Sequence, residues 1–144
     1  MKILVAVDGS PYTKRMLAYL AAHDEWLGSH HQYTVLHAVP AVPPRAAAVI
    51  DKATLKDYYD ETAEKVFKPI RSFLDKQGVK AQFVSKVGPP AVVIADTAKK
   101  GGKEGDFDLL ILGSHGHGTL TNLVMGSVAT KVLANCGTPA LLIR

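Results

Sequence analysis

The strongest constraint in this sequence is the alternation of short apolar runs with longer segments of helical periodicity. The runs are rich in β-branched and aliphatic residues and occupy residues 2–7, 33–39, 79–87, 107–113 and 140–144. Such runs are typical of strands buried on both faces of a sheet, and the third, which is less apolar, is expected near an edge. Strands that alternate with helices predict a parallel sheet with helices on both faces.

Two of the helices carry clear boundary signals. Ser10 and Pro11 have the character of an N-cap and a first helical residue, and Gly28 is expected to close the helix that follows. A long amphipathic helix is predicted over residues 51–77. Pro69 lies inside that pattern, so a kink or a local break is expected there.

The remaining elements complete the order β-α-β-α-β-α-β-α-β. Helices are expected over 91–100 and 127–135, and the proline-rich stretch 40–49 is expected to form no element. Of the two common five-stranded orders, 3-2-1-4-5 is preferred over 2-1-3-4-5. It places the turn at residues 8–10 beside the glycine-rich loop that follows the fourth strand. The prediction is a single α/β domain over residues 1–144 with a five-stranded parallel sheet.

Composition narrows the class of protein. The net charge is +4, but lysines and arginines are spread along the chain, so no nucleic-acid-binding face is expected. No apolar run approaches the roughly 20 residues that span a bilayer, and the first residues lack the pattern of a signal peptide. The single cysteine, Cys136, cannot form an internal disulfide and is expected to be packed rather than reactive. A cytoplasmic protein without membrane contact is therefore expected.

The link between the fourth strand and the last helix is longer than such a link requires. It takes about thirteen residues, whereas strand-to-helix loops commonly need about two to six. Backbone amides of a glycine-rich curve can converge on an anion, and the helix start at Gly126 and Ser127 adds partial positive charge. The loop therefore predicts a phosphate site, with Ser127 either capping the helix or contacting the phosphate. A plain surface loop is the alternative.

The glycines themselves suggest how such a site would work. Gly113 and Gly116 are expected to let the backbone approach a ligand, and they are candidates for positive φ. Two familiar phosphate motifs are absent. There is no G-x-x-x-x-G-K-[ST], and the glycines after the first strand do not follow G-x-G-x-x-G. A P-loop NTPase and a dinucleotide-binding Rossmann site are therefore not supported.

The spacing Gly113-x-x-Gly116, nine residues, then Gly126-Ser127 resembles the ATP-binding signature of universal stress proteins. The stretches "ILVAVDGS", "VLHAV", "VGPPAVVIADTA", "FDLLILGSHGHG" and "GTPALLIR" resemble the same family in the same order. The resemblance covers the whole chain. It implies a five-stranded α/β fold, usually a homodimer, that binds ATP without a firmly assigned reaction.

The resemblance also implies which residues form the nucleotide site. Ala6 and Val7 would lie beside the adenine, Asp8 would be the acidic residue, and Ala38, or Val39, would offer backbone hydrogen bonds to the base. Contacts to the ribose and phosphates would come from Leu112, Gly113, Ser114, His115, Gly116, Gly126, Ser127 and Val128. The implied ligand is ATP, ADP or AMP, with or without Mg²⁺. No catalytic residue and no dedicated metal site are expected.

One departure from the family pattern concerns charge. Many members carry Arg or Lys in this loop, where the present chain has His115 and His117. Phosphate charge would then be met by amides, Ser127, a metal ion or protonated histidine. Asp8 could hold Mg²⁺, bond a ribose hydroxyl or simply cap the first helix. His37, inside the second strand, is expected to be a hydrogen-bonded core residue.

Three functions stay open at this point. The first is a nucleotide-binding module in stress response or signalling, read by an unidentified protein partner. The second is a slow ATPase or phosphotransferase, and the third is a dimer that binds no nucleotide; the intact glycine signature argues against the third. No nucleophile elbow is present and no cation is available for a γ-phosphate, so turnover is expected to be slow or absent. The short apolar strand at 140–144 predicts a homodimer, because pairing two identical edges covers both.

Overall fold

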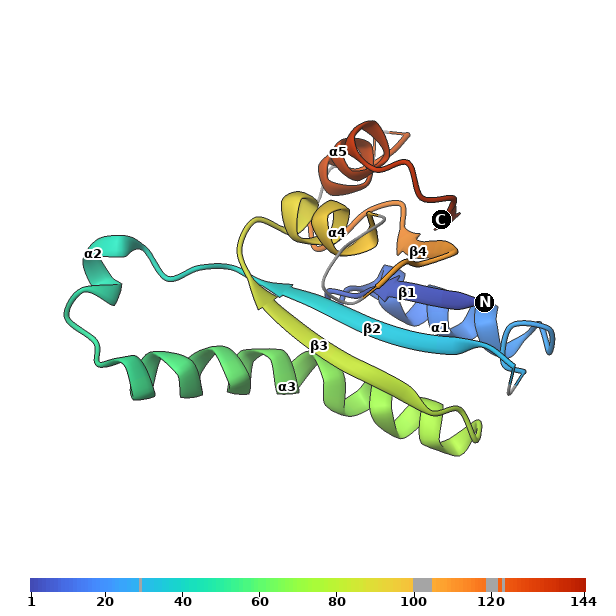
Figure 1. Ribbon diagram of the computed structural model, residues 1–144, viewed down its shortest axis with the longest axis horizontal. Coiled ribbons are helices and arrows are strands. Elements are labelled where there is room, and N and C mark those ends of the chain that lie inside the picture. Colours follow the sequence, from blue (N-terminus) through green and yellow to red (C-terminus); the bar gives the residue numbers. More distant parts are fainter. Residues whose placement is uncertain (29, 100–104, 119–121, 123) are drawn as a thin grey trace.

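The five predicted strands form a parallel sheet in the order β3-β2-β1-β4-β5 (Figure 1). The computed structural model describes the chain except for residues 29, 100–104, 119–121 and 123. The strands are β1 (Lys2–Ala6), β2 (Gln32–Val39), β3 (Ala81–Val87), β4 (Leu109–Gly113) and β5 (Ala140–Ile143). The predicted strand order is confirmed, and β3 lies at one edge, as its weaker apolar character indicated.

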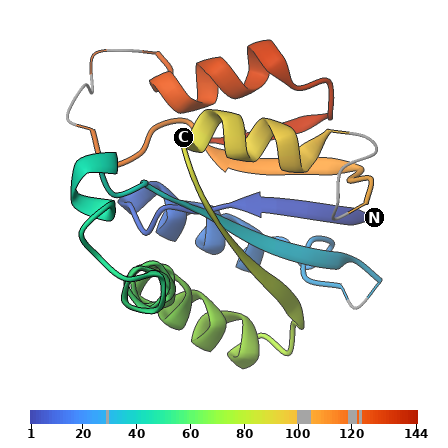
Figure 2. The same cartoon turned by 60° about the vertical axis from the view of Figure 1, so that its left-hand side comes forward.

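Helices cover both faces of this sheet, as Figures 1 and 2 show. They are α1 (Pro11–Ala21), α2 (Pro44–Ala47), α3 (Lys52–Lys76), α4 (Pro90–Ala98) and α5 (Ser127–Asn135). Helices α1 and α3 bury their apolar stripes in one core cluster, and α4 and α5 bury theirs in the other. Two hydrophobic layers therefore sandwich the sheet, which is the architecture that the alternating pattern predicted.

The central strand β1 contributes to both layers. Ile3 and Val5 point into the layer under α1 and α3, and Leu4 and Ala6 point into the layer under α4 and α5. Side chains alternate across a strand, so a continuous apolar run is the pattern that suits a strand covered on both sides. Pairing with β4 places the carboxyl end of β1 beside the end of that strand.

Helix α1 ends earlier than its sequence suggested. The expected closure at Gly28 is wrong, because the helix ends at Ala21. The Nδ1 atom of His23 donates to the carbonyl oxygen of Tyr19 at 2.7 Å, and the amide of Ala22 bonds back to the last turn. The helix end is thus capped by a histidine side chain rather than by glycine.

The proline-rich stretch was expected to form no element, but it contains the short helix α2. Its first residue is Pro44, whose fixed φ suits the start of a helix. The amides of Ala46 and Ala47 both donate to the carbonyl oxygen of Pro43, which closes the turn. Pro44 was interpreted as part of a loop, but it is the first residue of a helix.

Helix α3 begins after a side-chain cap. Oδ1 of Asp51 accepts from the amide of Thr54 at 2.8 Å, and Oδ2 accepts from the Thr54 hydroxyl at 2.7 Å. These bonds hold the pKa of the Asp51 carboxyl below its ordinary value. Of the kink or local break expected at Pro69, the break does not occur, because the helix runs without interruption to Lys76. Pro69 is exposed, so its missing N–H falls on the solvent side.

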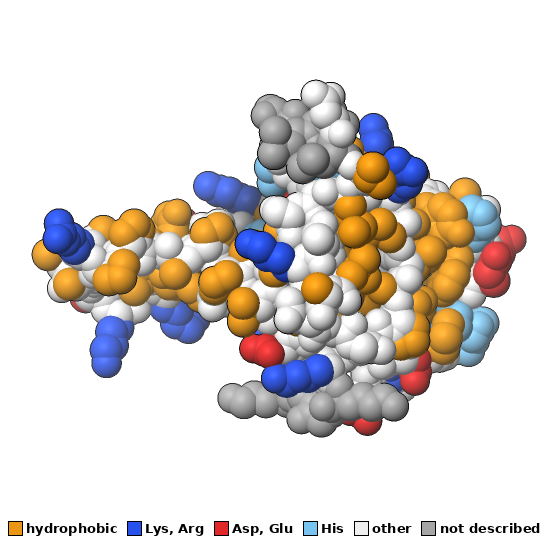
Figure 3. All heavy atoms as spheres, turned by 90° about the horizontal axis from the view of Figure 1, so that it is seen from above, with side chains coloured by type: hydrophobic (Ala, Val, Ile, Leu, Met, Phe, Trp, Pro, Cys, Tyr) orange, Lys and Arg blue, Asp and Glu red, His pale blue; other side chains and the backbone are white. Residues whose placement is uncertain are grey.

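Only the second half of α3 is buried against the sheet. Its buried residues begin at Ala63, and the first half projects beyond the sheet together with α2 (Figures 1 and 3). This projecting segment leaves Val49 and Tyr58 exposed, and Figure 3 shows basic side chains on the same projection. None of the described helices is both long and apolar enough to cross a membrane.

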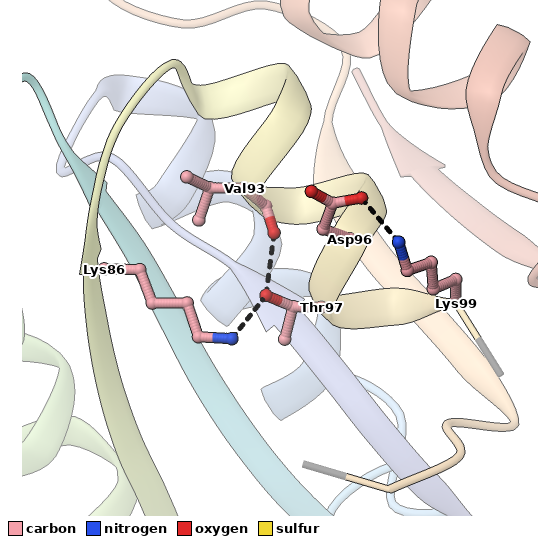
Figure 4. Close-up of polar contacts among 5 residues, drawn as sticks. All are labelled: Lys86, Val93, Asp96, Thr97 and Lys99. Carbon is pink, nitrogen blue, oxygen red and sulfur yellow. Dashed lines mark hydrogen bonds and ion pairs between the residues drawn. The ribbon is translucent and has the colours of Figure 1, made fainter. Parts of the chain in front are cut away.

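An inward-pointing lysine occupies the edge strand β3. Lys86 extends over α4, where its Nζ donates to the Thr97 hydroxyl at 3.1 Å (Figure 4). Thr97 in turn donates to the carbonyl oxygen of Val93 at 2.7 Å. A charge that points inward from an edge strand disfavours sheet-to-sheet association at that edge. The other edge strand, β5, begins directly after Pro139. It is short and consists of apolar residues.

Two predicted loops fall partly outside the described residues. They are the polar stretch before β4, at residues 99–106, and the glycine-rich loop before α5, at residues 113–126.

Candidate functional site

A cavity of about 570 Å³ opens at the carboxyl ends of β1, β2 and β4. The winding of the sheet reverses between β1 and β4, and ligands of parallel α/β sheets bind at such reversals. The volume lies within the roughly 300–1,000 Å³ of small-molecule sites. The walls come from these strand ends, from the turns that follow β1 and β4, and from α1, α3, α4 and α5.

The turn after β1 holds Asp8 in place. Oδ1 of Asp8 accepts from the amide of Ser10 at 2.9 Å and from the Thr13 hydroxyl at 3.1 Å. The Thr13 hydroxyl oxygen also accepts from the amides of Asp8 and Gly9, each at 3.2 Å. Gly9 has a φ of 75°, a conformation that glycine adopts without steric cost. One carboxylate oxygen therefore caps the first turn, while Oδ2 accepts no hydrogen bond from the described residues.

The glycines of the β4–α5 loop are required by packing within the protein. A Cβ at Gly113 would lie 2.8 Å from the Cβ of Tyr12, and a Cβ at Gly116 would lie 2.7 Å from Oδ2 of Asp8. The suggested positive φ at Gly113 and Gly116 is wrong, because neither residue has one. The space beside these glycines is taken by Tyr12 and Asp8, so their first role is to let the two turns approach each other.

Gly126 is packed in the same way at the start of α5. Its amide donates to the carbonyl oxygen of Ser114 at 2.6 Å, and a Cβ there would lie 3.0 Å from that same oxygen. Gly126 is itself the N-cap, so the suggestion that Ser127 caps the helix is wrong. The first helical hydrogen bond runs from the amide of Thr130, and the amides of residues 127–129 have no backbone acceptor in the described part of the chain.

Two histidines connect the loop to its surroundings. Nε2 of His117 donates to the carbonyl oxygen of Asp8 at 2.6 Å. Nδ1 of His115 lies 2.9 Å from the Ser114 hydroxyl oxygen, and its ring lies 5.2 Å from the ring of Tyr12. The loop after β4 is thus attached to both the turn after β1 and the first turn of α1.

The inner part of the cavity is lined mainly by apolar side chains. His37 lies there, 7% exposed, and its Nδ1 donates to the carbonyl oxygen of Val7 at 2.8 Å. Its ring and the ring of Phe67 form a T-shaped pair with centroids 6.2 Å apart. The expectation of a hydrogen-bonded core histidine is confirmed. The carbonyl oxygen of Val7 already accepts a hydrogen bond from His37. The cavity wall beside it therefore presents mainly apolar surface to a ligand.

Most of the residues predicted for the site line this one cavity. They are Ala6, Val7, Asp8, Ala38, Leu112, Gly113, His115, Gly116, Gly126, Ser127 and Val128. Val39 and Ser114 do not line it. The side chain of Val39 packs in the core layer under α1 and α3, and its carbonyl oxygen accepts from the amide of Gly88. Ser114 is buried, and its amide donates to the carbonyl oxygen of Ile143 at 2.7 Å.

The cavity also contains residues that were not predicted for it. They are Tyr12, Thr13, Met16, Leu36, His37, Pro40, Thr62, Val66, Pro90, Ile94, Gly118 and Ala129. His117, which was named beside His115 as a candidate for meeting the phosphate charge, also lines the cavity. Helical spacing could have found Tyr12 and Met16, which lie one turn apart after the Asp8 turn. Nothing in the local sequence marks Thr62 and Val66, which reach the cavity from the middle of a long helix.

The charge of the lining is small and negative. Among the described residues, Asp8 is the only charged side chain in the cavity wall. Within the same described ranges, no three His, Cys, Asp or Glu side chains gather as a metal site would require. The polar groups that remain for a ligand are the Asp8 carboxylate, the histidines and the backbone amides at the start of α5.

Comparison with known proteins supplies the family. The sequence profile of the Universal stress protein family matches residues 1–144. The chain is 32% identical over 142 residues to a universal stress protein of Thermus aquaticus, covering 99% of this chain and 97% of that one. The solved structure of protein MJ0577 of Methanocaldococcus jannaschii is similar with a TM-score of 0.78 at 25% identity, covering 99% and 94% of the two chains.

A third comparison extends the likeness of fold. A universal stress protein family protein of Arabidopsis thaliana, solved with AMP bound, is similar with a TM-score of 0.68 at 17% identity, covering 99% and 90% of the two chains. The profile match over all 144 residues, the Thermus relative and the shared fold agree, and the chain belongs to the universal stress protein family.

Proposed function

We propose that the cavity binds an adenine nucleotide, and that the protein acts as a nucleotide-binding module in stress response or signalling whose bound state is read by a protein partner. The observation that carries this proposal is the convergence of two unlike sets of groups on one cavity. The Asp8 carboxylate lies at one turn, and the amides of residues 127–129 lie at the other. A related fold that holds AMP supports it.

The chemistry of the lining fits the three parts of such a ligand. The apolar walls, with the small side chains of Ala6 and Ala38, suit a flat base. Oδ2 of Asp8 is an acceptor, which suits the donor hydroxyls of a ribose. The first amides of α5 favour a phosphate, because the partial positive charge of a helix start adds to their hydrogen bonds.

The same proposal includes a homodimer through β5. In the parallel pairing with β4, the carbonyls of Pro139 and Ile143 point toward β4. Backbone groups alternate in direction, so those of Ala140 and Leu142 point to the open edge. A second copy placed there would pair both open edges at once.

Calorimetric titration with AMP tests the nucleotide proposal. Ser127→Ala removes the hydroxyl, and Ser127→Pro also removes the first amide of α5. Proline suits this position, because it is the first of the helix and Gly126 before it is already extended. We expect Ser127→Ala to weaken binding by about 10-fold or more and Ser127→Pro to weaken it further, since a hydrogen bond to charge contributes about 1.5–3 kcal/mol. Wild-type affinity in both variants, with unchanged circular dichroism, would contradict the proposal.

A further inference from the structure

The cavity lacks the fixed positive charges that a polyphosphate needs. Its described lining includes no lysine or arginine, and Asp8 adds one negative charge. The whole loop before α5 also lacks these residues, because no lysine or arginine occurs in the sequence between Asp108 and Lys131. The part of the site that would receive phosphate therefore depends on neutral donors.

The carboxylate of Asp8 is linked to the helix start through two packing contacts of the loop after β4. Its Oδ2 packs on the backbone at Gly116, and the neighbouring His115 packs its Cα on Gly126. A negative charge at this place opposes each further negative charge brought to α5. The first phosphate is favoured by the helix start, and the following ones meet no lysine or arginine among the described lining residues.

The histidines are already engaged in bonds within the protein. His117 donates its Nε2 proton to the carbonyl of Asp8, and His37 donates its Nδ1 proton to the carbonyl of Val7. His115 lies against the Ser114 hydroxyl. A histidine side chain also lacks the permanent charge of lysine or arginine near neutral pH. These residues order the loop, but they do not supply the fixed charge that two or three phosphates require.

From this charge inventory we infer that the site selects an adenine nucleotide with a single phosphate group over ATP. The inference rests on the proposed adenine-nucleotide function and adds the class of ligand to it. A single phosphate group can take the donors at residues 127–129, where helix amides and dipole act together. The β- and γ-phosphates of ATP would need charge-assisted partners, and the lining residues that the structure describes include no lysine or arginine to provide them.

Titration with AMP and with ATP, each without and with Mg²⁺, tests the inference. We expect AMP to bind at least about 10-fold more tightly than ATP. The loss of one hydrogen bond to a charged group is enough to produce that ratio of affinities. Equal or tighter binding of ATP, with or without Mg²⁺, would overturn this inference while leaving the proposed function in place. Failure of both nucleotides to bind would contradict the proposed function and this inference with it.

A substitution that adds charge gives a second, independent test. His117→Lys places a permanent cation on the cavity wall, and Gln82→Lys adds the same charge on the exposed face of β3, outside the lining. We expect His117→Lys to lower the preference for AMP over ATP by about 10-fold or more. The matched control should leave that ratio unchanged. A ratio that stays at the wild-type value in folded His117→Lys protein would overturn the inference.

Discussion

Nε2 of His117 lies 2.6 Å from the carbonyl oxygen of Asp8, so a residue in the loop after β4 is hydrogen-bonded to a residue in the turn after β1. These residues are more than a hundred positions apart in the chain. The same two segments meet again where Gly116 packs on Oδ2 of Asp8. Both contacts depend on β1 and β4 being neighbours in the sheet. The cavity is therefore a consequence of the strand order.

The Asp8 turn should depend on Thr13 and not on the hydroxyl of Ser10. Thr13→Val leaves the amides of Asp8 and Gly9 without their acceptor, and we expect it to lower the free energy of unfolding by about 1–3 kcal/mol. In the control Ser10→Ala, the lost hydroxyl is buried and has no partner among the described residues. Its effect should stay within about 0.5 kcal/mol. Chemical denaturation measures both, and a larger loss for Ser10→Ala would contradict this account.

Gly126→Val should disturb the loop itself as well as the ligand site. Its Cβ would lie 3.0 Å from the carbonyl oxygen of Ser114, so we expect a loss of stability of about 1–3 kcal/mol together with a loss of nucleotide binding. Gly118 is the matched control in the same loop, because a Cβ there meets no atom within 4 Å. Thermal unfolding of Gly126→Val and Gly118→Val compares them. Equal stability of the two variants would show that the packing argument is wrong.

The proposed dimer should depend on the outward backbone of β5. Ala140→Pro removes an amide that points to the open edge, and the exposed side chain of Ala140 keeps the core untouched. We expect the wild type to scatter light as a dimer and the variant to shift toward a mass near the 15.4 kDa of one chain. A monomeric wild type across micromolar concentrations would exclude the dimer. A fully dimeric, folded variant would place the interface elsewhere.

Hydrolysis of ATP should be slow or absent. Loss of a cation that stabilises a transferring phosphoryl group can cost about 10³-fold or more in rate, and no lysine or arginine lies in the described lining of the cavity. We therefore expect steady-state turnover well below about 1 per second, which is near the low end of ordinary enzymes. A phosphate-release assay with Mg²⁺ measures it. Faster turnover that disappears in Asp8→Asn would identify an enzyme.

The sheet could be predicted because its signals are local. Continuous apolar runs identify strands that are covered on both faces, and the two unusual turns select the order that brings them together. The ends of the helices were less predictable. His23 caps α1 through the carbonyl of Tyr19, and Pro44 begins a helix inside a stretch that looks like a loop. Both depend on conformations that periodicity does not encode.

The position of the site could also be predicted, but the packing contacts that require its glycines could not. The spacing of the glycines indicated that the loop forms the site. The atoms that leave no room for a Cβ at these glycines belong to Tyr12, Asp8 and Ser114. Two of these three residues lie about a hundred positions away, so no local pattern reveals the contact. The same is true of Val66 and Thr62, which line the cavity from the middle of the long helix α3.

We propose that an adenine nucleotide occupies the cavity between the turn after β1 and the loop after β4. The most direct test is a heteronuclear NMR titration of isotopically labelled protein with AMP, which reports on each backbone amide separately. We expect AMP in the cavity to cause saturable shifts at the amides of Ala6, Ala38, Ser127 and Val128, and none on the outer surface of α3 around Lys68 and Lys76. Shifts confined to that outer surface, or no saturable shift at millimolar AMP, would contradict it.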